Sequence, residues 1–185
     1  MRPRPLTQLA QQSLRELLRP GDRVIDATLG NGHDTLFLAR QVAPGGRVVG
    51  FDVQQRALEQ TRARLADAGL DGVVSLQLGG HERMVAGVPA DWHGQVAAVM
   101  FNLGYLPGAD KALTTRAATT VAALDQAASL LRIGGQISLL VYRGHAGGAD
   151  EASAVAGWLG RLGACYRVTR HDSPGPLLFL IERLG

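Results

Sequence analysis

The sequence of 185 residues has one cysteine, one lysine and few aromatic side chains. The single cysteine, Cys165, excludes an internal disulfide and a cysteine-based zinc site, so we expect a packed thiol, no metal and a reducing, cytoplasmic compartment. No apolar run approaches the roughly 18 residues that span a bilayer, and glutamines interrupt any signal-like segment near the N-terminus. These absences argue against a membrane partner.

Hydrophobic residues make up 46% of the chain, which predicts one domain over residues 1–185 that buries about 70% of its unfolded surface. The net charge is only +3, but the cations are almost all arginine, with Lys111 as the only lysine. This bias fits an anionic partner such as RNA, although for any single arginine a compositional bias is the simpler explanation.

The stretch from residue 24 to residue 35 organises the rest of the chain. It starts as a short apolar run, breaks at Gly30 and Gly32, and continues into the apolar residues 36–39. This pattern predicts a strand, a tight turn and a helix. Glycine lets a ligand approach the main chain closely, and the N-terminus of the following helix offers free N–H groups. We therefore expect a binding site for a small polar ligand.

A carboxylate favours a nucleoside site at this turn. Residues 47–52 read as the next strand and end in Asp52, about 20 positions beyond Gly30, the spacing at which an acid meets ribose hydroxyls. Dinucleotide sites have a third glycine where this chain has Thr35, which is too large for that helix–strand packing. A dinucleotide is therefore disfavoured. An ordinary α/β turn with a strand-end aspartate is the alternative.

The turn resembles the first motif of class I methyltransferases, in which an acid is followed by glycines at the end of the first strand. Thr28 stands where such enzymes often have another glycine. The resemblance implies that S-adenosylmethionine is the cofactor, with Asp26 near its methionine part and Asp52 on its ribose. The cofactor contacts implied in the first two turns are Asp26, Gly30, Asn31, Gly32, Asp34, Asp52 and Gln54.

Hydrophobic periodicity and turn residues predict seven strands and their connecting helices. A helix over residues 6–19 is expected to cover one edge of the sheet, and Gly134-Gly135 is expected to end a long helix over residues 113–131. Further helices are predicted over residues 54–67 and 149–162, and strands from residue 24 and over residues 47–52, 73–78, 95–101, 136–142, 166–171 and 177–183. The resemblance implies an α/β, Rossmann-like sheet of order 3-2-1-4-5-7-6, mostly parallel with an antiparallel last strand and helices on both faces.

Residues 79–84 occupy the place where a class I methyltransferase meets the adenine ring. Many members have an aspartate there, and Gly79 cannot take that role. His81 and Glu82 are the candidates for the adenine contact. It is equally open whether His81 simply caps a short helix.

Residues 101–111 carry the most specific pattern in the chain. They resemble the Asn-Pro-Pro-Tyr loop of methyltransferases that modify nitrogen, with Asn102 and Tyr105 at the matching ends. Methyl transfer is an in-line displacement, so the enzyme mainly has to aim a lone pair. The Asn102 oxygen and the Leu103 carbonyl can accept N–H bonds of the nucleophile, and Tyr105 can stack on a base. The alternative is a turn cap at Asn102 and a packing role for Tyr105.

Five segments together are similar to a family of small bacterial enzymes long labelled "putative rRNA methylase". The match runs over nearly the whole chain, with mild departures at Ala109 and Arg143. The family is associated with N-methylation of 5-aminomethyl-2-thiouridine at the tRNA wobble position, which implies the anticodon region of tRNA as partner. The matching segments are residues 26–35, 50–54, 81–82, 102–111 and 141–148.

A primary amine is mostly protonated at neutral pH, so such a substrate needs a proton acceptor. His145, in a glycine-flanked loop after the fifth strand, is the candidate base, with Asp34 and Asp110 as alternatives. Phosphate contacts are expected from cations that flank the site. The candidate substrate and RNA contacts are Leu103, Gly104, Lys111 and Arg143.

Three other functions stay open from the sequence. A methyltransferase for an rRNA base would use the same chemistry. A nicotinamide-dependent dehydrogenase shares the fold class, although Thr35 argues against it. An RNA-binding module could have kept the fold and lost catalysis, although Asn102 and Tyr105 argue against that. A homodimer is also left open.

Overall fold

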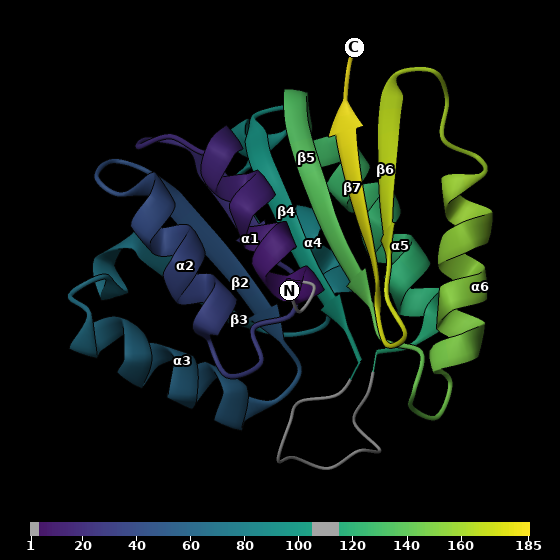
Figure 1. Cartoon of the computed structure of the whole chain (residues 1–185). Helices are drawn as coiled ribbons and strands as arrows, with labels where there is room; N and C mark the ends of the chain where they lie inside the picture. The colour runs from purple at the N-terminus through teal and green to yellow at the C-terminus, as the bar shows by residue number, and fades with distance from the viewer. Residues whose placement is uncertain (1–3, 105–114) are drawn as a thin grey trace.

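The computed structural model describes residues 4–104 and 115–185 of the chain. Its strands are β1 (Arg23–Asp26), β2 (Arg47–Asp52), β3 (Val74–Leu78), β4 (Val96–Leu103), β5 (Leu131–Val141), β6 (Tyr166–Asp172) and β7 (Leu177–Arg183). They form one sheet in the order β3-β2-β1-β4-β5-β7-β6 (Figure 1). β7 is antiparallel to β5 and to β6, and the other neighbours pair in parallel. The predicted fold class, strand order and direction are confirmed.

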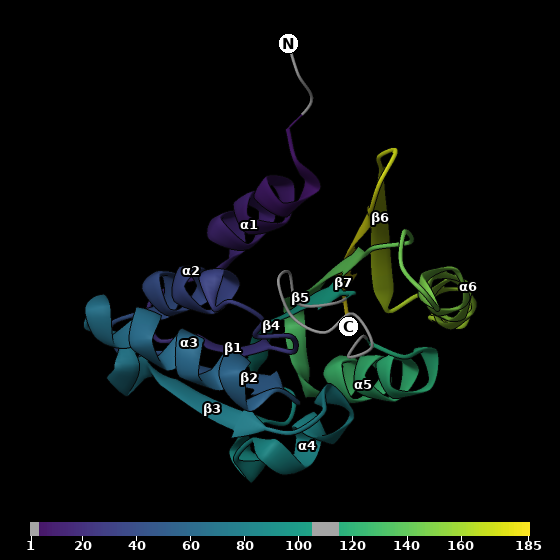
Figure 2. The ribbon, with the colours of Figure 1, turned by 90° about the horizontal axis from the view of Figure 1, so that it is seen from below.

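Helices cover both faces of the sheet (Figures 1 and 2). One face carries α1 (Leu6–Leu17), α2 (His33–Val42) and α3 (Gln55–Asp67), and the other carries α4 (Met84–Gly87), α5 (Ala117–Leu130) and α6 (Gly148–Leu159). Three short 3₁₀ helices lie in the connections: η1 (Asp71–Val73), η2 (His81–Arg83) and η3 (Ala90–Trp92).

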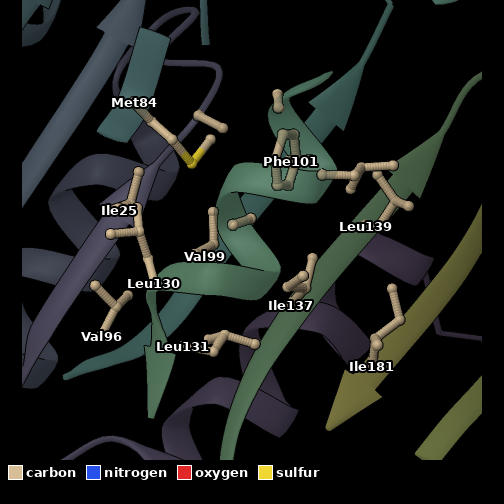
Figure 3. Packing of buried hydrophobic residues seen from close by; sticks show 14 of the residues in the cluster. Ile25, Met84, Val96, Val99, Phe101, Leu130, Leu131, Ile137, Leu139 and Ile181 are labelled. Carbon is tan, nitrogen blue, oxygen red and sulfur yellow. The ribbon is translucent and has the colours of Figure 1, made fainter. Parts of the chain in front are cut away.

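β4 is the central strand, and every one of its residues except Asn102 is buried. A parallel strand covered by helices on both faces needs apolar side chains on both sides, which explains its continuous apolar run. Figure 3 shows Val99 and Phe101 of β4 packed with Ile25, Ile137 and Leu139 of the flanking strands. This close packing fixes the carboxyl ends of β1, β4 and β5 relative to one another.

The position of α1 differs from the prediction. It does not cover an edge, because the edge strands are β3 and β6, whereas α1 packs on the face of the sheet against β5 and β7. Its apolar stripe, with Ala10 and Leu14 buried, needs an apolar partner surface, which Leu140 of β5 and Leu178 of β7 supply. The start of α1 consequently lies near the carboxyl edge of the parallel strands (Figure 1).

The boundary between α5 and β5 also differs from the prediction. The helix ends at Leu130 and β5 starts at Leu131, so Gly134-Gly135 lies inside the strand rather than at the helix end. The register between β4 and β5 shifts there, since Val96 pairs with Leu131 and Ala98 pairs with Gln136. The glycine pair accommodates this irregularity, with Gly134 at φ +73°.

Cys165 is exposed, not packed as predicted, because it lies in the turn that precedes the edge strand β6. Among the helices of the two described ranges, none is both long enough and apolar enough to cross a membrane.

Candidate functional site

A pocket of about 740 Å³ opens at the carboxyl ends of β1, β2 and β4. Its volume falls within the usual range for small-molecule sites, and open α/β sheets bind ligands at this edge. The pocket brings together most of the predicted residues that the structure describes. These lining residues are Gly30, Asn31, Asp34, Asp52, Gln54, His81, Glu82, Asn102, Gly104 and His145.

Asp52 fastens the glycine turn to the end of β2. Its Oδ2 accepts a 3.0 Å hydrogen bond from the N–H of Gly30, and its Oδ1 accepts a 2.9 Å bond from the N–H of Gln54. Gly30 has φ +53°, in the left-handed region that favours glycine. Burial raises the pKa of the Asp52 carboxyl, and the hydrogen bonds from backbone N–H groups oppose that rise. The predicted turn and acid thus meet at one wall of the pocket.

Asp26 supports the glycine turn from the side of the core. It does not line the pocket, whereas the sequence predicted a cofactor contact. Its side chain is fully buried and accepts hydrogen bonds from the Thr28 N–H at 3.1 Å and the Thr35 hydroxyl at 2.6 Å. Burial raises the pKa of Asp26 to about 7, with the charge of Asp34 as the next cause. The acid therefore acts on the shape of the turn.

Gly32 also differs from its predicted role, because it is buried and does not line the pocket. It precedes α2 with φ +75°, and a Cβ there would lie 2.7 Å from Thr61 Oγ1 and 2.9 Å from Thr61 Cα. Gly32 is therefore needed for the close packing of α2 on α3. Of the two glycines, only Gly30 lies at the pocket wall, where a ligand can approach the main chain closely.

Thr28 joins the ends of β1 and β4. Its hydroxyl oxygen accepts a 2.8 Å hydrogen bond from the main-chain N–H of Asn102. A glycine at position 28, as in many class I methyltransferases, could not make this bond. The departure from the family motif thus has a structural role, and both residues line the pocket.

Asn102 is held at its side chain as well as its main chain. Its Nδ2 donates a 2.7 Å hydrogen bond to Oδ2 of Asp34, and Oδ1 of Asp34 accepts a 2.6 Å bond from Gln11 Nε2 of α1. Leu103, the next residue, is buried and does not line the pocket, and its carbonyl accepts the N–H of Tyr142 at 3.1 Å. Leu103 thus differs from its predicted contact with substrate.

His81 and Glu82 both line the predicted adenine wall. The His81 ring is 6% exposed, tilts against Phe101 with 5.7 Å between ring centroids, and places Nδ1 3.3 Å from the Ala27 carbonyl oxygen. Within the described chain it makes no capping bond for η2, so the capping alternative is wrong. Burial lowers the pKa of His81, which favours the neutral ring at pH 7.

Of the residues in the loop after β5, His145 faces the pocket and Arg143 does not. Nδ1 of His145 lies 3.0 Å from the Ala146 carbonyl oxygen. Arg143 donates to the carbonyls of Ser173 at 3.2 Å and Gly175 at 3.1 Å, so it supports the turn between β6 and β7. The predicted phosphate contact from Arg143 is therefore turned away from the pocket, because backbone acceptors of that turn occupy its guanidinium.

Several lining residues were missed by sequence reasoning. Tyr142 directly follows β5, and burial, followed by the charge of Asp34, raises the pKa of its hydroxyl. The glutamines near the N-terminus were noted only as interruptions, but Gln11, one turn before the buried Leu14, was a signal for a polar contact on the inner face of α1. Other lining residues that were missed include Thr7, Thr115, Arg116 and Thr119.

Glu151 is a second buried acid that the sequence did not reveal. Its side chain is fully buried in α6 and accepts hydrogen bonds from Thr115 at 2.7 Å and Thr120 at 2.6 Å. These bonds fix Thr115 and the first turn of α5, and Thr115 lines the pocket together with Thr119 of α5. The predicted residues Tyr105, Asp110 and Lys111, together with Ala109, lie outside the described residues.

This chain resembles a protein family and three proteins that are described as methylases or methyltransferases, three of these four as "putative". Residues 48–174 match the family described as "Putative rRNA methylase". The chloroplastic tRNA (mnm(5)s(2)U34)-methyltransferase of Arabidopsis thaliana is 40% identical over 157 residues, which cover 80% of this chain and 57% of that protein. The chain thus spans little more than half the length of this curated relative.

Two crystal structures match over the full length of both chains. One is a "putative rRNA-methylase" from Clostridium thermocellum, 36% identical with a TM-score of 0.94. The other is a "putative methyltransferase" from Streptococcus mutans in complex with SAH, 34% identical with a TM-score of 0.87.

Proposed function

Because the chain belongs to the rRNA methylase family, we propose that it is an S-adenosylmethionine-dependent methyltransferase that acts on a nitrogen of RNA. The observation that carries the proposal is that Asn102, at the end of β4, shares one pocket with Gly30 and Asp52. The glycine turn that we propose for the cofactor thus lines the same cavity as Asn102 and Gly104, the described part of the nitrogen-directed motif. The SAH complex of the Streptococcus mutans relative supports the same cofactor class.

The pocket suits S-adenosylmethionine in charge as well as in size. The cofactor carries a sulfonium and an ammonium group, and the carboxylate side chains of Asp52 and Glu82 line the wall. Val53, which is 62% exposed and follows Asp52 directly in the chain, offers an apolar, open position for a nucleoside base. These residues therefore fit the cofactor that the family implies.

When bound, S-adenosylmethionine supplies a methyl group on a positively charged sulfur, which departs as a neutral thioether. The chain has to hold the acceptor nitrogen in line with that methyl group, and orientation of this kind is worth about 7–11 kcal/mol of the barrier. Asn102 Oδ1 holds an N–H of the acceptor amine. An ammonium group has no lone pair, so one proton must leave before transfer, and His145 accepts it at the pocket wall.

The acceptor that we propose is the 5-aminomethyl group of a wobble uridine in the anticodon region of tRNA. The name of the Arabidopsis relative, 40% identical to this chain, gives U34 of tRNA as the position on which that protein acts. An rRNA base is the competing acceptor, because the description of the matching family names rRNA.

The test uses the full chain with labelled S-adenosylmethionine and two acceptors, tRNA and rRNA, from a strain that lacks the gene. We expect label in tRNA, with conversion of 5-aminomethyl-2-thiouridine to its methylated form by mass spectrometry of nucleosides. The Asn102→Ala variant should abolish incorporation. Label in rRNA alone would overturn the tRNA assignment.

Two further measurements distinguish a methyltransferase from the other two kinds of protein considered. Calorimetric titration with S-adenosylmethionine and with NAD distinguishes a methyltransferase from a dehydrogenase, and we expect heat only with the former. RNA binding without any incorporation would identify a non-catalytic module. We also propose a cytoplasmic location and a single domain over residues 1–185. Light scattering of the purified chain measures whether it forms the homodimer that the sequence leaves open.

A further inference from the structure

Asp34 connects two parts of the chain that are far apart in sequence. Its Oδ2 accepts a 2.7 Å hydrogen bond from Asn102 Nδ2, 68 residues away, and its Oδ1 accepts a 2.6 Å bond from Gln11 Nε2, 23 residues away. Hydrogen bonds to a carboxylate at such distances are about twice as strong as neutral ones. Each carboxylate oxygen thus has a short bond to a different amide.

The carboxylate determines which way the Asn102 amide faces. A carboxylate only accepts, so the amide nitrogen must face Asp34 and Oδ1 must point away from it. The main chain of Asn102 is fixed independently, because its N–H donates to Thr28 Oγ1 at 2.8 Å. Within residues 4–104 and 115–185, no donor is bonded to Asn102 Oδ1. Asn102 lines the pocket, so its side chain brings an available acceptor to the cavity wall.

Gln11 holds Asp34 from a helix that is itself firmly anchored. Leu14, one turn after Gln11, is fully buried against the sheet, and Thr7, one turn before it, lines the pocket. α1 lies outside the part of the chain that matches the family, residues 48–174. The N-terminal helix therefore contributes to the site as well as to the core.

We propose that Asp34 is a positioning residue that aims Asn102 Oδ1 at the acceptor nitrogen, and that Gln11 acts through Asp34. This rests on the proposed function, in which Asn102 accepts an N–H of the amine. Without the carboxylate, the amide of Asn102 rotates and presents its nitrogen as often as its oxygen. Misplacement of about 1 Å at such a site costs about 100-fold in rate.

Kinetics of the full chain with tRNA give the first test. Asp34→Ala should lower kcat by about 100-fold, while the Kd for SAH changes far less, because the alignment of the acceptor is what is lost. Gln11→Ala should lower kcat by several-fold, and the double variant should match Asp34→Ala alone, because both changes break one chain of contacts. A native kcat in Asp34→Ala, or additive effects in the double variant, would overturn the proposal.

An exchange of the two side chains gives a sharper test. Asn102→Asp sets two carboxylates against each other and should reduce kcat most. In Asp34→Asn/Asn102→Asp, the new amide at position 34 donates to the carboxylate at position 102 and accepts from Gln11, so every bond is restored. We expect the double variant to regain at least about tenfold over Asn102→Asp, the scale of one restored charge-assisted bond. A double variant that is no better than Asn102→Asp contradicts the proposal.

Two exposed side chains provide matched controls. Gln8→Ala removes a glutamine from the same helix, and Asp67→Asn removes an acid at the end of α3. Neither residue lines the cofactor pocket, so both variants should keep native kcat. A loss in Gln8→Ala equal to that in Gln11→Ala would show that the helix surface, rather than the bond to Asp34, is responsible.

Nuclear magnetic resonance measures the orientation of the Asn102 side-chain amide without any RNA. Asn31 and Asn102 are the only asparagines of the chain, so asparagine-selective ¹⁵N labelling gives two pairs of side-chain amide signals. One Nδ2 proton of Asn102 should be shifted downfield and exchange slowly, and both properties should vanish in Asp34→Ala while the Asn31 signals stay. If native protein shows these signals yet methylates no RNA, the proposed function fails and the orientation stands. If Asp34→Ala keeps them, the orientation fails.

Discussion

The hydroxyl of Thr35 donates a 2.6 Å hydrogen bond to Oδ2 of Asp26, and neither side chain is exposed to solvent. Thr35 occupies the position at which dinucleotide-binding turns have their third glycine. The threonine, in the first turn of α2, therefore supplies a donor to a buried acid, where a glycine would supply none. The N–H of Thr28 bonds to the other carboxylate oxygen, so the acid has a donor on each side.

Loss of the Thr35 hydroxyl should destabilise the fold. Thr35→Val keeps the shape of the side chain but leaves one oxygen of the buried Asp26 carboxyl without its donor. We expect a loss of about 1–3 kcal/mol in the free energy of unfolding, measured by urea denaturation. Thr35→Ser should retain most of the stability. Thr169→Val, on the exposed edge strand β6, is the control and should stay within about 0.5 kcal/mol of native. Native stability in Thr35→Val would contradict this role.

The pKa of Asp26 predicts how stability depends on pH. Burial raises this pKa to about 7, whereas an unfolded aspartate has a pKa of about 3.9. Between these values the folded state keeps a proton that the unfolded state has released, so stability falls as the pH rises. Relative to Asp26→Asn, native protein should lose up to about 1.4 kcal/mol per pH unit from about pH 4 to about pH 7, and little above it.

Urea denaturation at several pH values measures this difference. The lowered pKa of His81 makes stability rise with pH below its unfolded value of about 6.5, in the opposite direction. Because His81 is present in both proteins, its contribution cancels in the comparison. Parallel pH profiles for native protein and Asp26→Asn would show that the folded-state pKa of Asp26 is not raised.

The strands were predictable because their apolar runs are strong and their ends carry turn residues. The bounds of β2 and β7 match the prediction, residues 47–52 and 177–183. The start of β5 was not predictable, because Gly134-Gly135 is a typical helix terminator in sequence. In the structure, pairing of Leu131 with Val96 of β4 extends the strand, so tertiary contact overrides the local signal.

The sequence predicted which chain positions lie near the pocket, but it did not predict which way each side chain points. Glycine and acid spacing located Gly30 and Asp52 on the pocket wall, yet the same motif placed Asp26 there, and its carboxyl points into the core. The bond from Gln11 to Asp34 joins α1 to the first turn of α2, on one face of the sheet. No local pattern specifies such a pairing, because it depends on where α1 docks.

A comparison of two glycines tests why position 32 needs glycine. Gly32 and Gly69 have similar backbone angles, φ +75° and φ +66°, but a Cβ at Gly32 would lie 2.7 Å from Thr61 Oγ1, whereas a Cβ at Gly69 meets nothing within 4 Å. Gly69→Ala should therefore cost only the left-handed strain, about 1–2 kcal/mol. Gly32→Ala should cost a further 1–3 kcal/mol, roughly, from overpacking. Equal losses of unfolding free energy would show that α2 and α3 separate without cost.

Asp52 is the residue whose loss should weaken cofactor binding most directly. Its carboxylate accepts from Gly30 at 3.0 Å and from Gln54 at 2.9 Å while it lines the pocket, so Asp52→Ala removes the ribose contact that we propose and loosens the turn. Titration with SAH should show affinity lowered by about 10- to 150-fold, the equivalent of one charged hydrogen bond. Asp71→Ala, an exposed acid in η1, is the control and should bind like native protein. Asp52→Asn should fall between native and alanine, because its amide oxygen still accepts one N–H. If Asp52→Ala binds SAH like native protein, the nucleoside lies elsewhere in the cavity.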